Sequence, residues 1–302
     1  MSSNDLPIAL ACRLDKSNAL DLTGKIMEYL MENNVKVVLE NRIAQRFHPH
    51  LRKNLRDMNE NAIKMVISVG GDGTILRICK NLPRKYPAPL LGINLGSVGF
   101  LDETDADPDI LYSALDKIIS GDYITEKVMR LSTYYKRRRL PDALNEVHIV
   151  SAKPSKVLHI GLKVDDQLVN TTYADGVLVC TSVGSTAYCI SAGGCLVDPR
   201  LRVMEIVPIN PFAASGAIKP IVVPGSSKVE IELLRPKLNA YVIIDGQSRY
   251  KAYPKSSIVV RRSASNIKFI RLDKSVPKSF YTKLRTKLLQ GPSLPEEDSP
   301  EV

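Results

Sequence analysis

The sequence predicts an α/β N-terminal domain with a parallel sheet, followed by a strand-dominated C-terminal domain. Over residues 1–125, strand-like apolar segments alternate with amphipathic helical segments, a pattern typical of a doubly wound sheet. Over residues 126–260, short runs rich in valine, isoleucine and leucine follow one another with few helical stretches between them. With 302 residues, of which 44% are hydrophobic, the chain is long enough to bury a core in each part.

The first elements of the N-terminal domain alternate in the expected order. They are a strand at Ile8–Leu14, a helix at Ala19–Met31, a strand at Val35–Leu39 and a polar helix at Arg42–Met58 that is interrupted near Pro49. The next segment, Met65–Val69, is a continuous apolar run. Such a run suits a parallel strand that is covered on both faces.

A fourth strand and two helices complete this domain. After a glycine-rich turn, Ile75, Ile78, Cys79 and Leu82 form one helical stripe, for which Thr74 is the expected N-cap. Leu90–Asn94 is a further strand. Asp107 and Pro108 open a helix that runs to about Ile119, and Gly121 closes it.

The strands of the C-terminal domain are expected at seven short runs. These are Ala143–Val150, Val157–Val164, Gly176–Thr181, Ile221–Val223, Val229–Leu234, Tyr241–Ile244 and Ile258–Val260. Residues 261–290 are expected to return to the N-terminal domain. The final segment, Gly291–Val302, is rich in proline, serine and acidic residues and is predicted to be a disordered acidic tail.

Composition limits the classes of partner. No apolar run approaches ~18 residues and the N-terminus lacks a basic start, so neither a membrane span nor a signal peptide is expected. Five scattered cysteines without a CxxC pair predict reduced thiols, a cytoplasmic setting and no zinc site, and the histidines show no ligand spacing. The net charge of +10 favours anionic partners. However, the basic block Lys136–Arg139 carries no nucleic-acid recognition motif, so no nucleic-acid partner is expected.

The turn Gly70-Gly71-Asp72-Gly73-Thr74 is the strongest candidate for chemistry. Glycines at the end of a strand expose backbone N–H groups, and the following helix adds its positive end, so phosphate is favoured there. An aspartate in such a turn makes sense if it orients or deprotonates a hydroxyl that attacks phosphorus. Arg77, one turn further, is expected to neutralise charge on the transferred group. The alternative is a tight turn with a capping aspartate.

A second candidate block, Asp175–Tyr188, combines a buried strand with a loop of small hydroxyl residues that ends in a tyrosine. Small residues permit close approach of a planar ligand, hydroxyls read its polar edge, and Tyr188 offers a ring. The competing hypothesis, Ser185 as a hydrolase nucleophile, lacks the G-x-S-x-G framing. A plain polar loop is the structural alternative. Asn145-Glu146 is a weaker candidate for binding ribose hydroxyls and a base edge.

Together these blocks resemble the NAD kinase family over most of residues 8–275. The resemblance is carried by Gly70–Thr74, Asn94–Leu101, Asn145-Glu146, Asp175–Tyr188 and Asp245-Gly246-Gln247. The GGDGT turn alone is shared with lipid kinases, whereas the ordered set is specific. The resemblance implies an NAD kinase/diacylglycerol kinase-like fold and the phosphorylation of NAD by ATP or polyphosphate. It also implies Mg²⁺ with the donor, and homodimers or homotetramers whose sites borrow residues from a neighbouring subunit.

The resemblance also implies individual roles. Asp72 would be the base acting on the 2′-hydroxyl of the adenosine ribose, with Gly73 and Arg77 beside it and Gly70, Gly71 and Thr74 forming the phosphate-donor turn. Asn145 and Glu146 would hold the adenine and a ribose, and Asp175 would meet the nicotinamide. The remaining expected substrate contacts are Phe100, Lys156, Thr186, Ala187, Tyr188, Cys189, Ile190, Ser191 and Gln247. No metal-ligating side chain is expected.

The chain departs from the family pattern at two places. Relatives commonly read Thr-Pro-Thr/Ser-Gly where this chain has Thr181-Ser182-Val183-Gly184, so a hydroxyl contact to the adenine is expected to be lost at Val183. The Pro-His motif of many relatives is replaced by Pro211-Phe212, which resembles an archaeal-type or divergent branch.

Two other functions are left open by the residues. A lipid kinase of the same superfamily would share the turn but leaves Asn145-Glu146 and the loop Thr186–Tyr188 without a role. A non-catalytic dinucleotide sensor has no need of an acid in its phosphate turn. Asp72 therefore favours a kinase.

Overall fold

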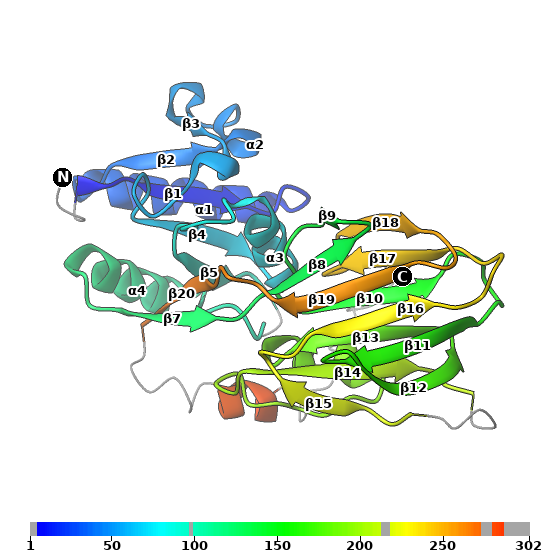
Figure 1. Cartoon of the computed structure of the whole chain (residues 1–302). Coiled ribbons are helices and arrows are strands. Elements are labelled where there is room, and N and C mark those ends of the chain that lie inside the picture. The colour runs from blue at the N-terminus through cyan, green and yellow to red at the C-terminus, as the bar shows by residue number, and fades with distance from the viewer. Residues whose placement is uncertain (1–4, 97–98, 213–217, 273–279, 287–302) are drawn as a thin grey trace, which may run out of the picture.

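The first half of the chain forms a mostly parallel sheet with helices on both faces (Figure 1). The computed structural model describes residues 5–96, 99–212, 218–272 and 280–286. The strand order is β3-β2-β1-β4-β5-β20-β7, with β6 paired to β5. The strands are β1 (Ile8–Cys12), β2 (Val37–Glu40), β3 (Arg52–Lys53), β4 (Met65–Gly70), β5 (Leu90–Asn94), β6 (Thr104–Asp105), β7 (Ile124–Val128) and β20 (Ile267–Arg271).

The helices cover the sheet because its strands are apolar on both sides. Helices α1 (Ser17–Glu32) and α4 (Pro108–Ser120) pack on one face, where Leu10 and Ile67 point. Helix α3 (Asp72–Asn81) packs on the other face, against Ala9 and Val66. This alternation along the buried strands confirms the predicted parallel α/β sheet.

Local helix signals were confirmed for α4 and corrected for α3. The Asp107 side chain accepts N–H bonds from Asp109 and Ile110, and Gly121 ends the helix with a φ of 79°. By contrast, α3 begins at Asp72 with Gly71 at the N-cap, so Thr74 lies in the first turn and is not the cap. The acidic residue starts the helix because it is stabilised near the positive end of the helix dipole.

The polar helix predicted at Arg42–Met58 was wrong. The segment contains a one-turn helix α2 (Asn41–Ala44), two 3₁₀ turns (Pro49–Leu51 and Leu55–Asp57) and the short strand β3. Residues Arg52 and Lys53 pair with Leu39 and Glu40 and so extend the sheet at its edge. Pro49 and the polar composition leave too few apolar side chains to bury a longer helix.

The C-terminal part is two six-stranded antiparallel sheets packed face to face. One has the order β15-β14-β13-β10-β17-β18 and the other β12-β11-β16-β19-β8-β9. Their strands are β8 (Leu131–Tyr135), β9 (Arg138–Arg139), β10 (Glu146–Ser151), β11 (Leu158–Val164), β12 (Gln167–Ala174), β13 (Gly176–Thr181), β14 (Val203–Ile209), β15 (Ile221–Pro224), β16 (Val229–Leu233), β17 (Ala240–Ile244), β18 (Ser248–Ala252) and β19 (Ser257–Arg262).

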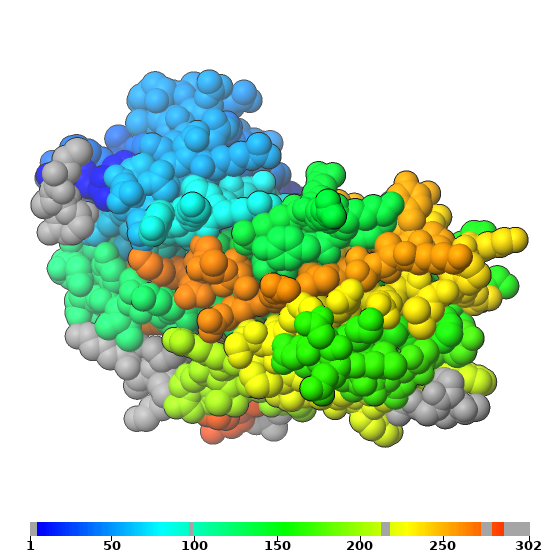
Figure 2. Space-filling model, in the orientation of Figure 1, coloured from blue at the N-terminus to red at the C-terminus, as the bar shows by residue number. Residues whose placement is uncertain are grey.

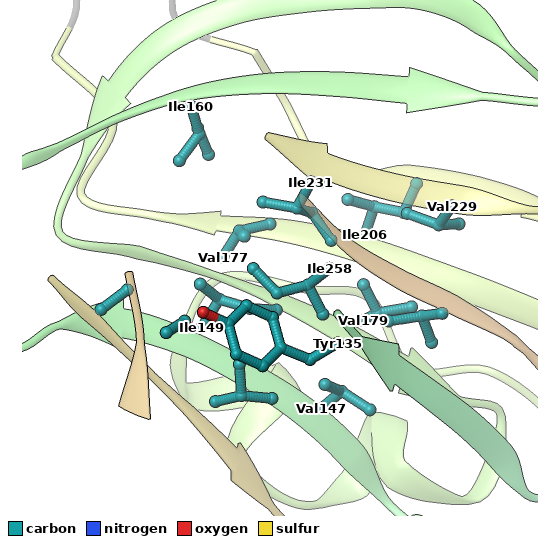
Figure 3. Packing of buried hydrophobic residues seen from close by; sticks show 14 of the residues in the cluster. Tyr135, Val147, Ile149, Ile160, Val177, Val179, Ile206, Val229, Ile231 and Ile258 are labelled. Atoms are coloured by element: carbon teal, nitrogen blue, oxygen red, sulfur yellow. The ribbon is translucent and has the colours of Figure 1, made fainter. Parts of the chain in front are cut away.

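The core between these two sheets is almost entirely aliphatic. Val147, Val179 and Ile206 from the first sheet meet Ile231 and Ile258 from the second (Figure 3). All five side chains are at most 1% exposed. The predicted strand-dominated C-terminal domain is therefore confirmed.

The chain passes between the two parts twice, from β7 to β8 and from β19 to β20. Strand β20 pairs parallel with β5 and antiparallel with β7 in the first sheet. In the space-filling view, these orange strands extend from the yellow and green part into the blue and cyan part (Figure 2). Residues 291–302, predicted to be a tail, lie outside the described residues. Within the described ranges, no helix is long and apolar enough to cross a membrane.

Candidate active site

The glycine-rich turn lies where the direction of the sheet order reverses. Strands β1 and β4 are neighbours, and the chain runs outward from them to β2 on one side and β5 on the other. In open α/β sheets this point leaves a crevice at the carboxyl ends of the strands. A cavity of about 290 Å³ lies there and is lined by Arg13, Lys16, Gly70, Gly71, Asp72, Gly73, Asn94, Leu95, Gly96 and Gly99.

This cavity has the chemistry of a phosphate cradle. A Cβ placed on Gly71 or Gly73 would meet no atom within 4 Å, so the glycines keep the space open for a ligand. The first turn of α3 adds backbone amides and the positive end of its dipole. The two lining cations, Arg13 and Lys16, follow β1. Sequence reasoning missed them because only the β1–β4 pairing brings them to the turn.

The Asp72 carboxylate is held in a fixed orientation at this turn. Its Oδ2 accepts the backbone N–H of Phe100 and its Oδ1 accepts that of Leu101, both at 3.0 Å. The structure thus brings together the two glycine-bearing loops that follow β4 and β5. Each carboxylate oxygen of Asp72 accepts only one N–H in these contacts. Each therefore keeps a lone pair that can accept a hydrogen bond from a hydroxyl.

The structure does not bring Arg77 into the cradle. Its guanidinium binds both carboxylate oxygens of Glu40 and also donates to the carbonyl of Cys12 at 3.2 Å. Glu40 is 3% exposed, and this ion pair lies between β1, β2 and α3. Arg77 is therefore bound within the fold and does not line the cradle, and its expected role at the transferred group stays a prediction.

The second part of the site is assembled around the buried carboxylate of Asp245. This carboxylate accepts the backbone N–H groups of Leu144 at 2.8 Å, Asn145 at 2.8 Å and Glu146 at 3.1 Å. Burial raises the pKa of Asp245 to about 6, although the three N–H bonds act in the opposite direction. The arrangement fixes the start of β10, where the candidate residues Asn145 and Glu146 lie.

Glu146 is a buried acid whose surroundings disfavour its charged form. Burial, followed by the nearby charge of Asp245, raises the pKa of Glu146 to about 8. Its Oε2 has no hydrogen-bond partner among the described residues. A protonated carboxyl group can donate a hydrogen bond as well as accept one.

The loop after β13 packs tightly against this strand. The Thr181 hydroxyl donates to the Leu144 carbonyl at 2.6 Å and accepts the Gly184 N–H at 3.0 Å. A Cβ on Gly184 would come within 2.1 Å of the Asn145 carbonyl oxygen, so only glycine fits there. Ser185 donates to the Ser182 carbonyl at 2.7 Å and is fully buried, which leaves it unsuited to act as a nucleophile.

The short helix α5 (Tyr188–Ser191) carries four of the expected contacts. Tyr188 is 43% exposed and its ring meets His148 edge-on at 5.3 Å, whereas Cys189 is fully buried. The Cys189 thiol donates to Glu205, which also accepts the thiol and the N–H of Cys195. Cysteines that are scattered in the sequence thus hold α5 in place. The described residues contain no cluster of His, Cys, Asp and Glu suited to a metal.

Two expected contacts lie far from the others on this chain. Asp175 precedes β13 and Lys156 lies in the connection that follows β10, both at the end opposite to Glu146 and Thr181. Five residues of strand separate the two ends, a distance of about 17 Å. Asp175 accepts a hydrogen bond from the Asn210 amide at 2.9 Å. Lys156 is exposed.

Gln247 closes the site between the two parts of the chain. Its side-chain amide donates to the Gly73 carbonyl at 2.9 Å. This contact joins the phosphate cradle to the turn whose Asp245 fixes the start of β10. Models of protein families identify the two parts that it joins: residues 8–123 match the ATP-NAD kinase N-terminal domain, and residues 144–272 match the ATP-NAD kinase C-terminal domain. The chain belongs to the NAD kinase family. It is therefore an enzyme that phosphorylates NAD.

Individual NAD kinases are similar over nearly the whole chain. The NAD kinase of Methanothermobacter thermautotrophicus is 38% identical over 94% of this chain and 96% of its own length. That of Pyrococcus furiosus is 34% identical over 93% of this chain and 99% of its own. These archaeal relatives agree with the expected archaeal-type membership.

Solved NAD kinase structures have the same architecture. A crystal structure of an NAD kinase from Archaeoglobus fulgidus in complex with ATP matches with a TM-score of 0.74 and 29% identity, covering 93% of this chain and 99% of that one. Yeast NADH kinase complexed with NADH matches with a TM-score of 0.83 at 20% identity, which concerns the fold alone. NAD kinase is thus favoured over the lipid kinase and the sensor.

Proposed function

We propose that this NAD kinase transfers the terminal phosphoryl group of ATP to the 2′-hydroxyl of the adenosine ribose of NAD, with Asp72 as the base. The observation that carries the proposal is the Asp72 carboxylate, held by two backbone N–H groups at the edge of a glycine-lined cradle. A fixed carboxylate beside phosphate-binding amides suits a reaction that depends on positioning and charge.

The proton and the phosphoryl group move in opposite directions in this step. Asp72 accepts the proton of the 2′-hydroxyl while the ribose oxygen forms a bond to the terminal phosphorus. The bond between that phosphorus and the leaving oxygen breaks, and ADP departs with the electron pair. The amides of Gly71 and Gly73 hold the phosphates during the transfer, together with Lys16 and with Arg13, whose guanidinium would exchange the exposed Asp15 carboxylate for phosphate.

The dinucleotide would extend from the phosphate cradle toward the C-terminal part. Asn145 and Glu146 are placed to hold the adenine and a ribose, and the loop from Thr186 to Tyr188 lines the base pocket. The buried Glu146 side chain supports this assignment, because its unpartnered Oε2 and its raised pKa leave it able to donate or accept. Val183 adds only an apolar surface, since it has no hydroxyl.

A divalent cation fits this cradle as a companion of the donor. The cradle has open space at Gly71 and Gly73, and the described residues contain no group of three or more His, Cys, Asp and Glu side chains suited to hold a metal ion. Mg²⁺ would thus be held by the donor phosphates, which the amides of Gly71 and Gly73 bind in turn. When bound, it would neutralise phosphate charge. We expect EDTA to abolish turnover and excess Mg²⁺ to restore it.

A homo-oligomer with shared sites would explain the placement of Asp175 and Lys156. Both lie one strand length from Glu146 on the same chain, and a second copy with its own Asp175 and Lys156 at this site would bring them to the bound dinucleotide. Co-expressing Asp72→Asn with Asp175→Asn tests this. Shared sites restore about a quarter of the wild-type rate in a randomly mixed dimer, whereas unshared sites restore none. Five free thiols support a reducing, cytoplasmic setting for this assembly.

The catalytic assignment is tested by turnover and binding measured together. The protein is incubated with NAD, ATP and Mg²⁺ and NADP is detected by mass spectrometry, with polyphosphate as a second donor. Asp72→Asn should lose turnover but keep NAD binding by calorimetry, because asparagine has nearly the same shape. Asp21→Asn, at an exposed position in α1, is the control. NADP formation by Asp72→Asn at the wild-type rate would contradict the proposal.

A further inference from the structure

Residues 280–286 are helical and contact both parts of the protein beside the catalytic turn. The Tyr281 hydroxyl donates to the Asp198 carboxylate at 2.8 Å, in the loop that follows α5. The Phe280 ring lies 6.2 Å from that of Phe100. In the same helical segment, the Lys283 ammonium donates to the backbone carbonyl of Asp102. This segment thus reaches the loop whose amides hold Asp72.

Lys283 lines a small cavity of about 40 Å³. Phe100, Leu101 and Val183 contribute apolar lining, and Glu126 and Arg271 contribute charged side chains. Burial, and then the charge of Arg271, lowers the pKa of Lys283, while the carboxylates of Glu103, Asp102 and Asp72 act in the opposite direction. The Lys283 ammonium is therefore attracted by the carboxylates of Glu103, Asp102 and Asp72.

Two of these acids approach each other closely. A Cβ on Gly99 would lie 2.3 Å from Asp102 Oδ2 and 2.5 Å from Asp72 Oδ1, so both carboxylates crowd the same point. Like charges at such a separation repel each other. A neighbouring cation offsets that repulsion, and the Lys283 ammonium is bonded to the backbone of one of the two acids.

The loop from Gly99 to Asp102 therefore has two anchors. On one side, the N–H groups of Phe100 and Leu101 hold the Asp72 carboxylate. On the other side, Lys283 holds the Asp102 carbonyl. Lys283 thus contacts the same loop that holds Asp72, although it lies 211 positions after Asp72 in the chain.

We propose that Lys283 is a positioning residue for phosphoryl transfer: its ammonium fixes the Gly99–Asp102 loop and offsets the charge of the Asp72–Asp102 pair. This inference rests on the proposed role of Asp72 as the base. Lys283 acts through the loop and does not contact the phosphates, since it does not line the cradle. Its effect is thus on the rate of the chemical step rather than on binding.

The test compares Lys283→Met, Lys283→Arg and the exposed Lys237→Met in the full chain. Methionine keeps the length of the side chain and removes the charge. Lys283→Met should lower kcat by about tenfold to a hundredfold, as expected for a misplaced catalytic group, with KM for NAD and ATP little changed. Lys283→Arg should recover most of the rate, and Lys237→Met should match the wild type.

Hydrogen–deuterium exchange gives a second readout that does not need activity. Peptides covering residues 99–103 should exchange faster in Lys283→Met than in Lys237→Met. A raised KM for ATP with unchanged kcat would make Lys283 a phosphate ligand and overturn the proposal, as would unchanged kcat and exchange. If Asp72→Asn kept full turnover, the role of Asp72 would fail, whereas the exchange result would still report on the Lys283 contact.

Discussion

Gln247 donates its side-chain N–H to the carbonyl of Gly73 at 2.9 Å, joining residues 174 positions apart. Gly73 belongs to the phosphate cradle after β4, and Gln247 belongs to the turn between β17 and β18. Two residues earlier in that turn, Asp245 holds the amides that start β10. One turn thus fixes the cradle and the dinucleotide side of the site relative to each other.

Replacing Gln247 with alanine tests this link. The variant loses the hydrogen bond between Gln247 and the Gly73 carbonyl, and such a bond is worth about 1 kcal/mol. We therefore expect kcat/KM for NAD to fall by about threefold to tenfold. The melting temperature should change little, because Gln247 is half-exposed. Gln167→Ala, at an exposed position in β12, is the control. An unchanged kcat/KM would mean that the phosphate cradle and the turn between β17 and β18 keep their relative positions without this bond.

The close approach of Gly184 to Asn145 gives a second prediction. In Gly184→Ala, the new Cβ would meet the Asn145 carbonyl at 2.1 Å, and backbone atoms on both sides must shift. We expect destabilisation by about 1–3 kcal/mol in urea unfolding, together with weaker NAD binding, because the loop and the start of β10 move apart. Gly96→Ala, which meets nothing within 4 Å, is the control for stability. Equal stability of the two variants would contradict the tight contact.

Buried Arg130 links three segments at the junction of the two parts. It is 2% exposed and donates to the carbonyl and hydroxyl of Ser265 at 3.0 and 2.8 Å and to the Arg84 carbonyl at 3.2 Å. Arg130→Met leaves these acceptors and the Asp142 carboxylate with fewer partners. The free energy of unfolding should fall by about 3 kcal/mol. Arg138→Met, at an exposed site, is the control. Its free energy of unfolding should lie within ~0.5 kcal/mol of that of the wild type.

The arrangement of the parallel sheet could be predicted because its signals are local. Buried strands such as Met65–Gly70 are continuously apolar, and the stripe from Ile75 to Cys79 has helical spacing. The cap of α4 follows from Asp107, Pro108 and Gly121 alone. The segment Arg42–Met58 was mispredicted because its polar residues fit helix and turn equally well, and only pairing of β3 with β2 decides between them.

Strands with polar or exposed faces were missed in the C-terminal part. Gln167–Ala174 has no clear apolar run and lies at the edge of its sheet, where pairing with β11 rather than burial makes it a strand. Similarly, Ser248–Ala252 alternates exposed and half-buried residues opposite β17. Long-range pairing of this kind leaves little trace in a single sequence.

At the site, the sequence could indicate residue types but not their partners. Asp72 was identified from its turn, whereas the amides of Phe100 and Leu101 that hold it come from another loop. Arg77 was expected at the phosphates because it lies one turn after Asp72. In the structure its guanidinium binds the buried carboxylate of Glu40 at the end of β2. No local signal could have indicated that Lys283 reaches the Asp102 carbonyl.

The protonation of Glu146 predicts a pH dependence of stability. Its pKa is raised from 4.5 to about 8, so the native protein holds a proton there that the unfolded chain releases. Over that interval the native state binds more protons, and the contribution of Glu146 to stability therefore falls as pH rises. Glutamine resembles the protonated acid but cannot titrate. The melting temperature of Glu146→Gln should thus be close to that of the wild type at pH 5 and above it at pH 9.

Differential scanning fluorimetry from pH 5 to pH 9 measures this difference directly. Glu28→Gln, at an exposed position of α1, is the matched control and should show a difference that stays constant with pH. A constant difference for Glu146→Gln as well would mean that Glu146 is ionised in the native protein at pH 5. Asp245 would then face a second buried negative charge, and the three N–H bonds at the start of β10 would have to stabilise both carboxylates. We expect the melting-temperature difference between Glu146→Gln and the wild type to rise with pH, because those N–H groups all bond to Asp245 and none bonds to the Glu146 carboxylate.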